Sequence, residues 1–283
     1  MAQNTRLARL SWIAYQESSD VFQKWHESQD HKGKEPADLA WQKANSNWDP
    51  LKDAVELPQY ATCLTSDAQA YAFKMAPADP LILACRGTSS VQDAMVDVSL
   101  QLVPFVFADG SPKTGVSVHR GFYEQFKGIM PQVDKLYRGH LAGGGTLLCI
   151  GHSLGSAVAA LAALYYGQLY PGKVSYVGFG TPRVGNGEFV KLFNSVIKSP
   201  VRVANGRDPV NKIPPPVCYG HVCPETHVGR SDPYTAIPVL SDLPDHDIKN
   251  GYIHNLENPA AEATPVPKSY STWFTEAISR FRA

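Results

Sequence analysis

The feature that most constrains this chain is the pentapeptide GHSLG at residues 151–155, where an apolar run meets a helical pattern. The preceding TLLCI (146–150) has the short, continuous apolar character of a strand buried on both faces. Residues 154–169 repeat apolar side chains at spacings of three and four, which predicts an amphipathic helix. A strand that turns into a helix through G-x-S-x-G is the pattern called a nucleophile elbow.

The chemistry of such a turn depends on its glycines and on the serine between them. Gly151 and Gly155 lack the Cβ atoms that would clash in so sharp a turn. Ser153 is therefore expected to stand exposed at the start of a helix, where free N–H groups favour developing negative charge. The pattern predicts that Ser153 is a nucleophile, and the alternative is a serine that only forms a turn.

The rest of the chain alternates strand-like and helical segments. With 283 residues, 43% of them hydrophobic, it can bury a large core. The alternation predicts one α/β domain over residues 1–283, with a mainly parallel sheet covered by helices on both faces. Pro131 is expected to kink or restart the helix over 121–139. The other expected strands are 70–76, 81–87, 174–180 and 200–205, and the other expected helices are 187–198 and 271–282.

A serine nucleophile needs a base, and the base needs a carboxylate that orients it. On the fold that carries a nucleophile elbow, the order along the chain is serine, acid, histidine. Asp208 fits the acid best, because it follows the strand 200–205 and an Asn-Gly turn. Its alternative is a turn-forming aspartate before Pro209. Three later aspartates follow no strand and rank below it: Asp232, Asp242 and Asp245.

The same order selects the histidine. His152 and the four histidines before it are excluded, which leaves His221, His227, His246 and His254. His246, in DLPDHDIKNGY, is expected on a short polar loop far enough past Asp208 to return over the sheet. We predict His246 as the base, with His254 as the second candidate, and a solvated surface histidine is the alternative for either.

Composition excludes several other classes of function. Lys+Arg and Asp+Glu both number 26, so no basic face for nucleic acid is indicated. No run approaches the ~18 apolar residues of a membrane span. The first residues do not form a signal peptide and instead predict an amphipathic helix with Leu7, Leu10 and Ala14 on one face. Export with a removed leader and a cytoplasmic location both remain open.

The five cysteines do not form a dense disulfide framework. Cys218 and Cys223 could close a small loop as a disulfide, which is favoured over a metal site, while the odd total leaves at least one thiol unpaired. Together with His221 and His227 they have a spacing that could also bind zinc, but no second pair completes a recognisable signature. We therefore expect neither a metal nor a cofactor.

With these residues assigned, the chain resembles the class 3 lipases, the fungal-type triacylglycerol lipase group of the α/β-hydrolases. The resemblance spans residues 82–215 in the family's order, and several motifs together make it specific. It implies the α/β-hydrolase fold and hydrolysis of acylglycerol esters. The motifs are ILACRGTSSVQDAMVDV (82–98), VHRGFYEQF (118–126), IGHSLGSAVAALAAL (150–164), GFGTPRVGN (178–186) and RVANGRDPVNKIPP (202–215).

The resemblance also implies an oxyanion hole. Thr88 would supply one contact through its backbone N–H and its hydroxyl, and the N–H of Leu154 would supply the second. This agrees with the general geometry of an elbow and an earlier strand–helix loop. The alternative for Thr88 is a helix-capping or turn residue.

By the same resemblance, residues 89–97 would form a lid helix. Val91, Met95 and Val98 fall at spacings of four and three and would form its apolar face, although an ordinary packed helix is an equal alternative. Ala94 stands where the family often has Trp. Residues 100–107 and 212–217 are candidate walls of an acyl pocket, with core packing as the alternative.

The carboxy-terminal third departs from the family. CYGHVCPETHVGR (218–230) holds two partial copies of the family's Gly-Tyr-x-His-Val-Gly run, so neither His221 nor His227 is assigned a role from it. The family's catalytic histidine usually stands in a His-x-x-Tyr context, whereas here His246 and Tyr252 are farther apart.

The leading hypothesis is therefore a serine carboxylic-ester hydrolase, a lipase whose ester or lipid substrate lies at a lipid–water interface. Phospholipase A1 and feruloyl-type esterase are alternatives on the same fold. A non-catalytic lipid-binding protein is an alternative of another class. The sequence does not determine acyl chain length or oligomeric state.

Overall fold

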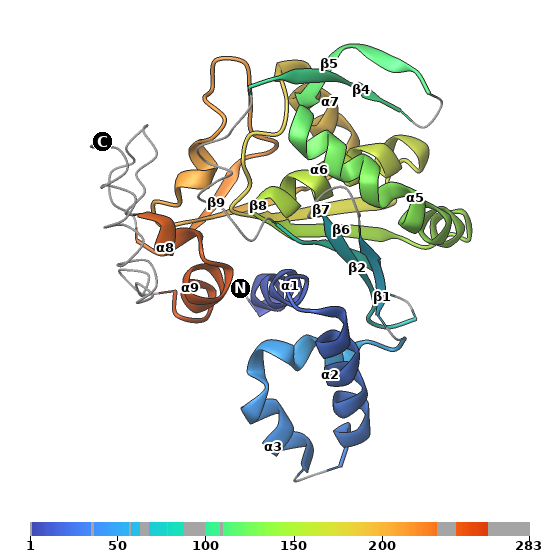
Figure 1. The fold of residues 1–283 in the computed structure, drawn as a ribbon, viewed down its shortest axis with the longest axis vertical. Coiled ribbons are helices and arrows are strands. Elements are labelled where there is room, and N and C mark those ends of the chain that lie inside the picture. Colours follow the sequence, from blue (N-terminus) through green and yellow to red (C-terminus); the bar gives the residue numbers. More distant parts are fainter. Residues whose placement is uncertain are drawn as a thin grey trace.

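A sheet with the strand order β1-β2-β3-β6-β7-β8-β9 forms the centre of the computed structural model (Figure 1). The structure describes residues 2–34, 37–56, 58–62, 68–77, 79–87, 100–107, 110–230 and 242–259. The strands from β3 to β9 run parallel, and β1 and β2 extend the sheet antiparallel to them. The strands are β1 (Gln59–Thr62), β2 (Gln69–Lys74), β3 (Leu81–Cys85), β6 (Leu147–His152), β7 (Val174–Phe179), β8 (Val201–Asn205) and β9 (Glu225–Val228), and β4 (Leu102–Val106) and β5 (Pro112–His119) form a separate hairpin.

Helices cover both faces of this sheet (Figure 1). In chain order they are α1 (Ala2–Ile13), α2 (Ser18–His31), α3 (Ala37–Ala44), the 3₁₀ segment η1 (Ser46–Asp53), α5 (Arg120–Ala142), α6 (Leu154–Leu169), α7 (Gly187–Val196), the 3₁₀ turn η2 (Pro209–Lys212), α8 (Leu243–His246), the π-helical turn η4 (Ile248–Ile253) and α9 (His254–Glu257). The sheet and its two helical layers confirm the predicted α/β-hydrolase architecture.

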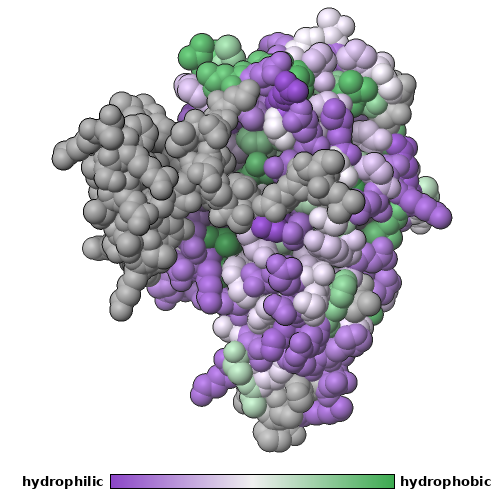
Figure 2. Space-filling view, viewed as in Figure 1, coloured by the Kyte–Doolittle hydropathy of each residue, from purple (hydrophilic) through white to green (hydrophobic). Residues whose placement is uncertain are grey.

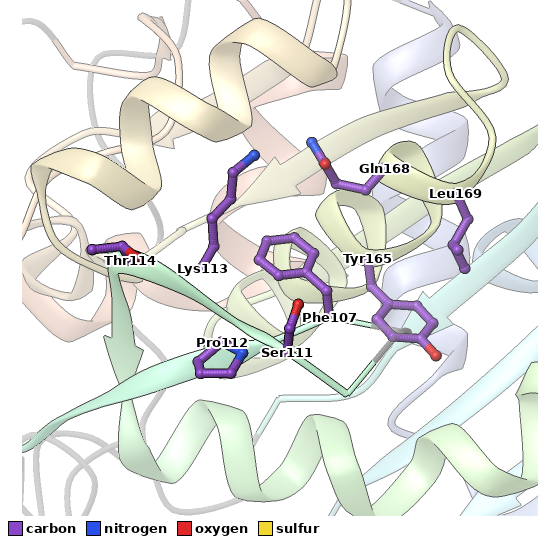
Figure 3. Close-up of a pocket in the computed structure, with 8 residues that line it drawn as sticks. All are labelled: Phe107, Ser111, Pro112, Lys113, Thr114, Tyr165, Gln168 and Leu169. Atoms are coloured by element: carbon purple, nitrogen blue, oxygen red, sulfur yellow. The ribbon is translucent and has the colours of Figure 1, made fainter.

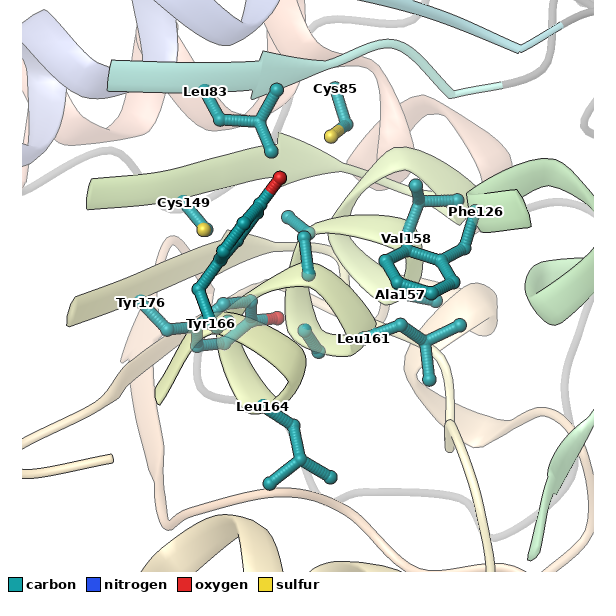
Figure 4. Packing of buried hydrophobic residues seen from close by; sticks show 14 of the residues in the cluster. Leu83, Cys85, Phe126, Cys149, Ala157, Val158, Leu161, Leu164, Tyr166 and Tyr176 are labelled. Carbon is teal, nitrogen blue, oxygen red and sulfur yellow. The ribbon is translucent and has the colours of Figure 1, made fainter. Parts of the chain in front are cut away.

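The core is divided in two by the sheet. On one face α5, α6 and α7 bury a large cluster, in which the alanines of α6 let this helix approach β3 and β6 closely (Figure 4). On the other face a second cluster packs α1, η1 and η4 against the same strands. Because both faces are covered, the central strands are buried throughout, as their continuous apolar sequences predict.

Three features of the fold differ from the sequence predictions. Helix α5 continues through Pro131, because the proline lies on the exposed face while Met130 and Val133 keep the apolar side of the helix buried. Strand β9 was not expected, since its side chains are mostly exposed and show no apolar pattern. His246 ends the short helix α8 instead of lying on a loop. The predicted strands over 70–76, 81–87, 146–150, 174–180 and 200–205 are confirmed within a few residues.

The amino-terminal segment forms the expected helix α1, and Leu7, Leu10 and Ala14 are all buried. Helices α2 and α3 extend away from the sheet at the lower end of the view, where the visible surface is mainly hydrophilic (Figures 1 and 2). Within the described residues, no helix combines the length and the apolar character that crossing a bilayer requires. The predicted helix over 271–282 lies outside the described residues.

Candidate active site

The turn between β6 and α6 has the strained geometry of a nucleophile elbow. Ser153 has φ of 58° and ψ of −137°, a conformation that side chains rarely adopt. A Cβ on Gly151 would overlap the Gly155 carbonyl group, and one on Gly155 would overlap the carbonyl oxygen of Cys85. Both glycines are therefore required by the close approach of backbone atoms, as the sequence pattern predicts.

Backbone hydrogen bonds hold Ser153 in this conformation. Its N–H donates to the Phe179 carbonyl oxygen at 2.9 Å, and its own carbonyl accepts from the N–H of Ser156 at 2.9 Å and from the Ser156 hydroxyl at 2.5 Å. The expectation that this turn exposes Ser153 is wrong for the described residues, in which only 2% of Ser153 is exposed. Leu154 is the first residue of α6, so its N–H is one of those that the helix itself leaves unpaired.

An aspartate and a histidine from distant segments meet beside this turn. The Nδ1 atom of His246 lies 2.8 Å from Oδ2 of Asp208, and both residues are buried. Asp208 follows β8, and its Oδ1 accepts from the N–H of Val210 at 2.8 Å, which caps η2. Asp208 is thus held by its own turn while its second oxygen faces the imidazole.

Tyr252 provides a further donor to the same carboxylate. Its hydroxyl donates to Asp208 Oδ2 at 2.5 Å. Burial and then the neighbouring Asp208 carboxylate raise the pKa of Tyr252 well above its ordinary value, so this hydroxyl remains a donor. The sequence analysis did not assign Tyr252 a role, although its place after His246 in HDIKNGY was a signal.

The second ring nitrogen of His246 is left available. Because Nδ1 donates to Asp208, Nε2 of the neutral ring is an acceptor. This Nε2 is buried and has no hydrogen-bond partner within the part of the chain that the structure describes. The ring lies next to the elbow, since its centroid is 4.5 Å from that of His152, the residue before Ser153.

Gly180, after β7, makes room for this pair. Its φ is +58°, and a Cβ there would lie 2.8 Å from Asp208 Oδ2 and 3.0 Å from Cε1 of His246. A side chain at this position would therefore push against both partners. The sequence gives no separate signal for Gly180, because a glycine after a strand does not by itself reveal which side chains lie opposite it.

An ion-pair cluster fixes the segment that precedes His246. Arg230 contacts Asp242 Oδ1 at 2.9 Å and Asp245 Oδ2 at 2.7 Å, and both aspartates are buried. Asp245 Oδ2 also accepts from the backbone N–H of Arg207 at 2.7 Å. These bonds join α8 to the loop of Asp208. They also give Asp242 and Asp245 partners other than a histidine, while Asp232 lies outside the described residues.

The chain is similar in sequence to known lipases and to a phospholipase. The family model described as Lipase (class 3) matches residues 82–218. The secreted mono- and diacylglycerol lipase A of Penicillium cyclopium is 31% identical over 167 residues, which cover 58% of this chain and 52% of the relative. The phospholipase A1-II 3 of Oryza sativa subsp. japonica is 27% identical over 186 residues, covering 56% of this chain and 44% of the relative. The chain thus matches about half the length of these curated relatives.

This class 3 segment, residues 82–218, is thus similar in sequence to the class 3 lipases. The fold is likewise similar to that of the triacylglyceride lipase of Rhizomucor miehei, with a TM-score of 0.63, 21% identity and coverage of 80% of this chain and 79% of that one. The class 3 segment contains Ser153 and Asp208 but ends before His246. The candidacy of His246 therefore rests on its contacts and not on the family match.

The other histidine candidates lie in different surroundings. His221 Nε2 donates to the Asn211 carbonyl at 2.7 Å, and burial, with Arg202 and Arg183 nearby, lowers the pKa of His221 to about 3. His227 contacts Glu225, which raises the pKa of His227. His254 is half-buried on α9, and within the described residues no hydrogen bond joins it to Asp208.

The predicted disulfide between Cys218 and Cys223 is wrong. Both thiols are free, because Cys223 packs into the core cluster while Cys218 faces solvent. Among the described residues, no three His, Cys, Asp or Glu side chains lie close enough together to bind a metal ion, so the geometry does not support the zinc alternative.

Several predicted residues cannot be compared with the structure. Thr88 and the lid residues, Val91, Met95 and Val98 within or next to 89–97, lie outside the described residues. Of the candidate acyl-pocket walls, Phe105 packs into the core with the rings of Tyr123 and Phe126. Val217 is 88% exposed, so it lines no pocket among the described residues.

One pocket of about 400 Å³ lies away from this site (Figure 3). It opens between the β4–β5 hairpin and the last turn of α6, where Tyr165 and Leu169 face Phe107 and Lys113. At 1.5 Å per residue, Tyr165 is about 18 Å along the helix axis from Ser153. The pocket is therefore separate from the elbow.

Proposed function

We propose that this chain is a serine carboxylic-ester hydrolase, a lipase that cleaves acylglycerol esters through an acyl-enzyme on Ser153. One observation carries the proposal: beside a strained serine, the His246 ring donates through Nδ1 to Asp208 and keeps Nε2 unpaired. A serine nucleophile needs a base oriented in this way beside it, and this supports the proposal.

The proposed reaction has two halves. Ser153 Oγ attacks the ester carbonyl as its proton passes to His246 Nε2, and the protonated ring then gives this proton to the leaving alcohol. Water next attacks the acyl-enzyme with His246 again as base, which releases the fatty acid and restores the serine. Asp208 fixes the imidazole tautomer and stabilises the charged ring, and Tyr252 fixes Asp208.

The tetrahedral oxyanion requires two donors. The N–H of Leu154 is suited because it begins α6, where the helix dipole also favours negative charge. Thr88 is proposed as the second donor. Residues 89–97 are proposed as a lid whose apolar side chains, Val91, Met95 and Val98, cover the substrate site and contact lipid when it opens.

The substrate class is supported by the relatives. The Penicillium cyclopium protein is named a mono- and diacylglycerol lipase, and the class 3 match includes the segment that holds both Ser153 and Asp208. The neutral net charge of the chain suits an uncharged ester. No metal or cofactor is needed for the proposed chemistry.

The test is the hydrolysis of p-nitrophenyl esters from acetate to palmitate by the intact chain and by Ser153→Ala. We expect Ser153→Ala to lower kcat by about 10⁶-fold, since the nucleophile is lost. Ser195→Ala, which changes an exposed serine on α7, is the matched control and should retain full activity. A fluorophosphonate probe should label the intact chain and the control but not Ser153→Ala. If Ser153→Ala keeps most of the activity, the proposal is wrong.

Phospholipase A1 activity is the second candidate, favoured by the similarity to the rice enzyme. Diacylglycerol and phosphatidylcholine, presented in the same mixed micelles, distinguish the two. A lipase should release fatty acid mainly from diacylglycerol, and a rate jump above the concentration at which substrate aggregates would indicate a lid. Preference for phosphatidylcholine would replace the lipase assignment.

A further inference from the structure

His152 is a buried, titratable ring that the proposed reaction does not use. Only 3% of it is exposed, and it lies between the amino-terminal segment and the segment of His246. Its Nδ1 is 2.8 Å from the hydroxyl of Tyr15, which follows α1, and its Nε2 is 2.7 Å from the backbone carbonyl oxygen of His246. The ring thus joins residues that are 137 and 94 positions away in sequence.

The donor and acceptor of each of these two hydrogen bonds follow from the chemistry of the groups. A carbonyl oxygen can only accept, so His152 Nε2 carries a hydrogen and donates to His246. Burial, together with the neighbouring His246, lowers the pKa of His152 well below its ordinary value, so the ring is neutral. Its Nδ1 is then an acceptor, and the Tyr15 hydroxyl donates to it.

These bonds hold His246 at a second point. Asp208 holds the ring of His246 through Nδ1, whereas His152 holds its main chain through the carbonyl. The two imidazole rings also pack in a tilted arrangement, with centroids 4.5 Å apart. Two separate attachments fix the direction in which Nε2 points. A ring attached only through Nδ1 could still turn about that bond.

Tyr15 also lies close to the serine. A Cβ on Gly87 would overlap the Tyr15 hydroxyl and would come within 3.0 Å of the Ser153 Cβ. The hydroxyl is therefore packed against the backbone at the end of β3, one residue before Thr88, and beside the elbow. Its position depends on the amino-terminal segment, which neither the elbow motif nor the class 3 segment contains.

We propose that Tyr15 and His152 are positioning residues: the hydrogen-bonded chain from the Tyr15 hydroxyl through the His152 imidazole to the His246 carbonyl aims His246 Nε2 at Ser153. The proposal rests on the proposed ester hydrolysis for its kinetic readout. It makes the amino-terminal segment part of the reaction's geometry, although that segment supplies no reacting atom.

The first test is Tyr15→Phe, which removes one hydroxyl and keeps the ring. We expect kcat for a soluble ester to fall about tenfold with KM unchanged, because a misdirected base affects the transition state and not substrate binding. Tyr71→Phe is the matched control, since the Tyr71 hydroxyl donates to the Gln16 carbonyl at 3.1 Å and anchors the same turn without touching His152. An unchanged kcat in Tyr15→Phe, or an equal loss in Tyr71→Phe, would overturn the proposal.

The second test is a double-mutant cycle. His152→Leu should lower kcat more than His152→Gln, whose amide N–H can still donate to the His246 carbonyl. Adding Tyr15→Phe to His152→Leu should cause no further loss, because Tyr15 acts through the missing ring. Additive losses would mean that Tyr15 acts by another route, which contradicts the proposal.

The third test does not depend on catalysis. The ring N–H of His246 that faces Asp208 should give a far-downfield proton resonance in the intact chain. Tyr15→Phe should shift or broaden this resonance, and Tyr71→Phe should leave it unchanged. If the intact chain does not hydrolyse esters, the proposed function is wrong. The resonance can still be measured in that case, and it tests separately whether Tyr15 positions His246. A resonance identical in Tyr15→Phe and the intact chain would refute that role.

Discussion

The two halves of the candidate site are held in different ways. The elbow region, residues 147–169, is fixed by backbone atoms that lie close in the sheet, and its glycines are dictated by contacts of 3 Å or less from hypothetical Cβ atoms. The histidine region, residues 242–257, is held by side chains from remote segments: Asp208, which contacts both His246 and Tyr252, together with His152 and Arg230. The nucleophile can therefore be recognised in the sequence from a short motif. The base cannot, because its position depends on side chains from several distant segments.

The largest effect is expected from an alanine in the elbow region. In Gly155→Ala the new Cβ would meet backbone atoms of Cys85 and Arg86, which cannot rotate away. We expect a loss of about 3 kcal/mol in the free energy of unfolding and no esterase activity, measured by urea denaturation and p-nitrophenyl ester hydrolysis. Gly139→Ala in α5 is the control, since nothing lies within 4 Å of its Cβ, and should stabilise the chain by up to about 1 kcal/mol. Equal stability of the two variants would remove the backbone argument.

An intermediate effect is expected from the histidine region. Arg230→Gln would leave two buried carboxylates, those of Asp242 and Asp245, without their cation. We expect a loss of about 2 kcal/mol, somewhat below the cost of breaking a fully buried pair because Arg230 is partly exposed. kcat should fall with it while KM is retained. The control Arg120→Gln breaks an exposed pair with Glu124 and should change stability by less than about 0.5 kcal/mol. A loss in Arg230→Gln no larger than in the control would show that the network is dispensable.

A pH dependence of stability is carried by two histidines, His152 in the elbow region and His221 outside both regions. Their pKa values are lowered on folding, for His221 to about 3, from about 6.5 in the unfolded chain. Below pH 6.5 the unfolded chain binds protons that the folded chain does not, so stability falls as pH falls. The slope is about 1.4 kcal/mol per pH unit for each histidine. Thermal unfolding between pH 7 and 4 measures it, and His221→Gln should reduce the slope by one proton. An unchanged slope would refute the assignment to His221.

The sequence analysis succeeded where a pattern depends on neighbours in the chain. The strand over 146–150, the helix from residue 154 and the turn of Asp208 follow from local apolar spacing and from glycine chemistry, and all three are observed. The expectation that Asp208 and His246 come together used only chain order and a strand end, and their side chains are 2.8 Å apart.

Predictions from the sequence were wrong or missing where contacts between distant segments determine the structure. Cys218 and Cys223 have a spacing suited to a disulfide, but core packing directs one thiol inward while the other faces solvent. β9 forms because β8 offers an open edge, which its own residues ETHV do not reveal. The sequence does not indicate the roles of Tyr15 and Arg230, because the fold, and not their spacing in the sequence, brings them to their partners.

The π-helical turn η4 has a consequence for how such chains are compared. Both Gly251 and Tyr252 donate their N–H groups to the Asp247 carbonyl, so the backbone winds wider than an α-helix just after His246. Tyr252 thereby returns to the carboxylate that also receives His246, although six positions separate them. The wider turn accommodates the additional residues while His246 and Tyr252 both remain in contact with Asp208. Chains whose histidine and tyrosine differ in spacing can therefore share one arrangement around the acid, and an alignment that forbids insertions here would separate true relatives.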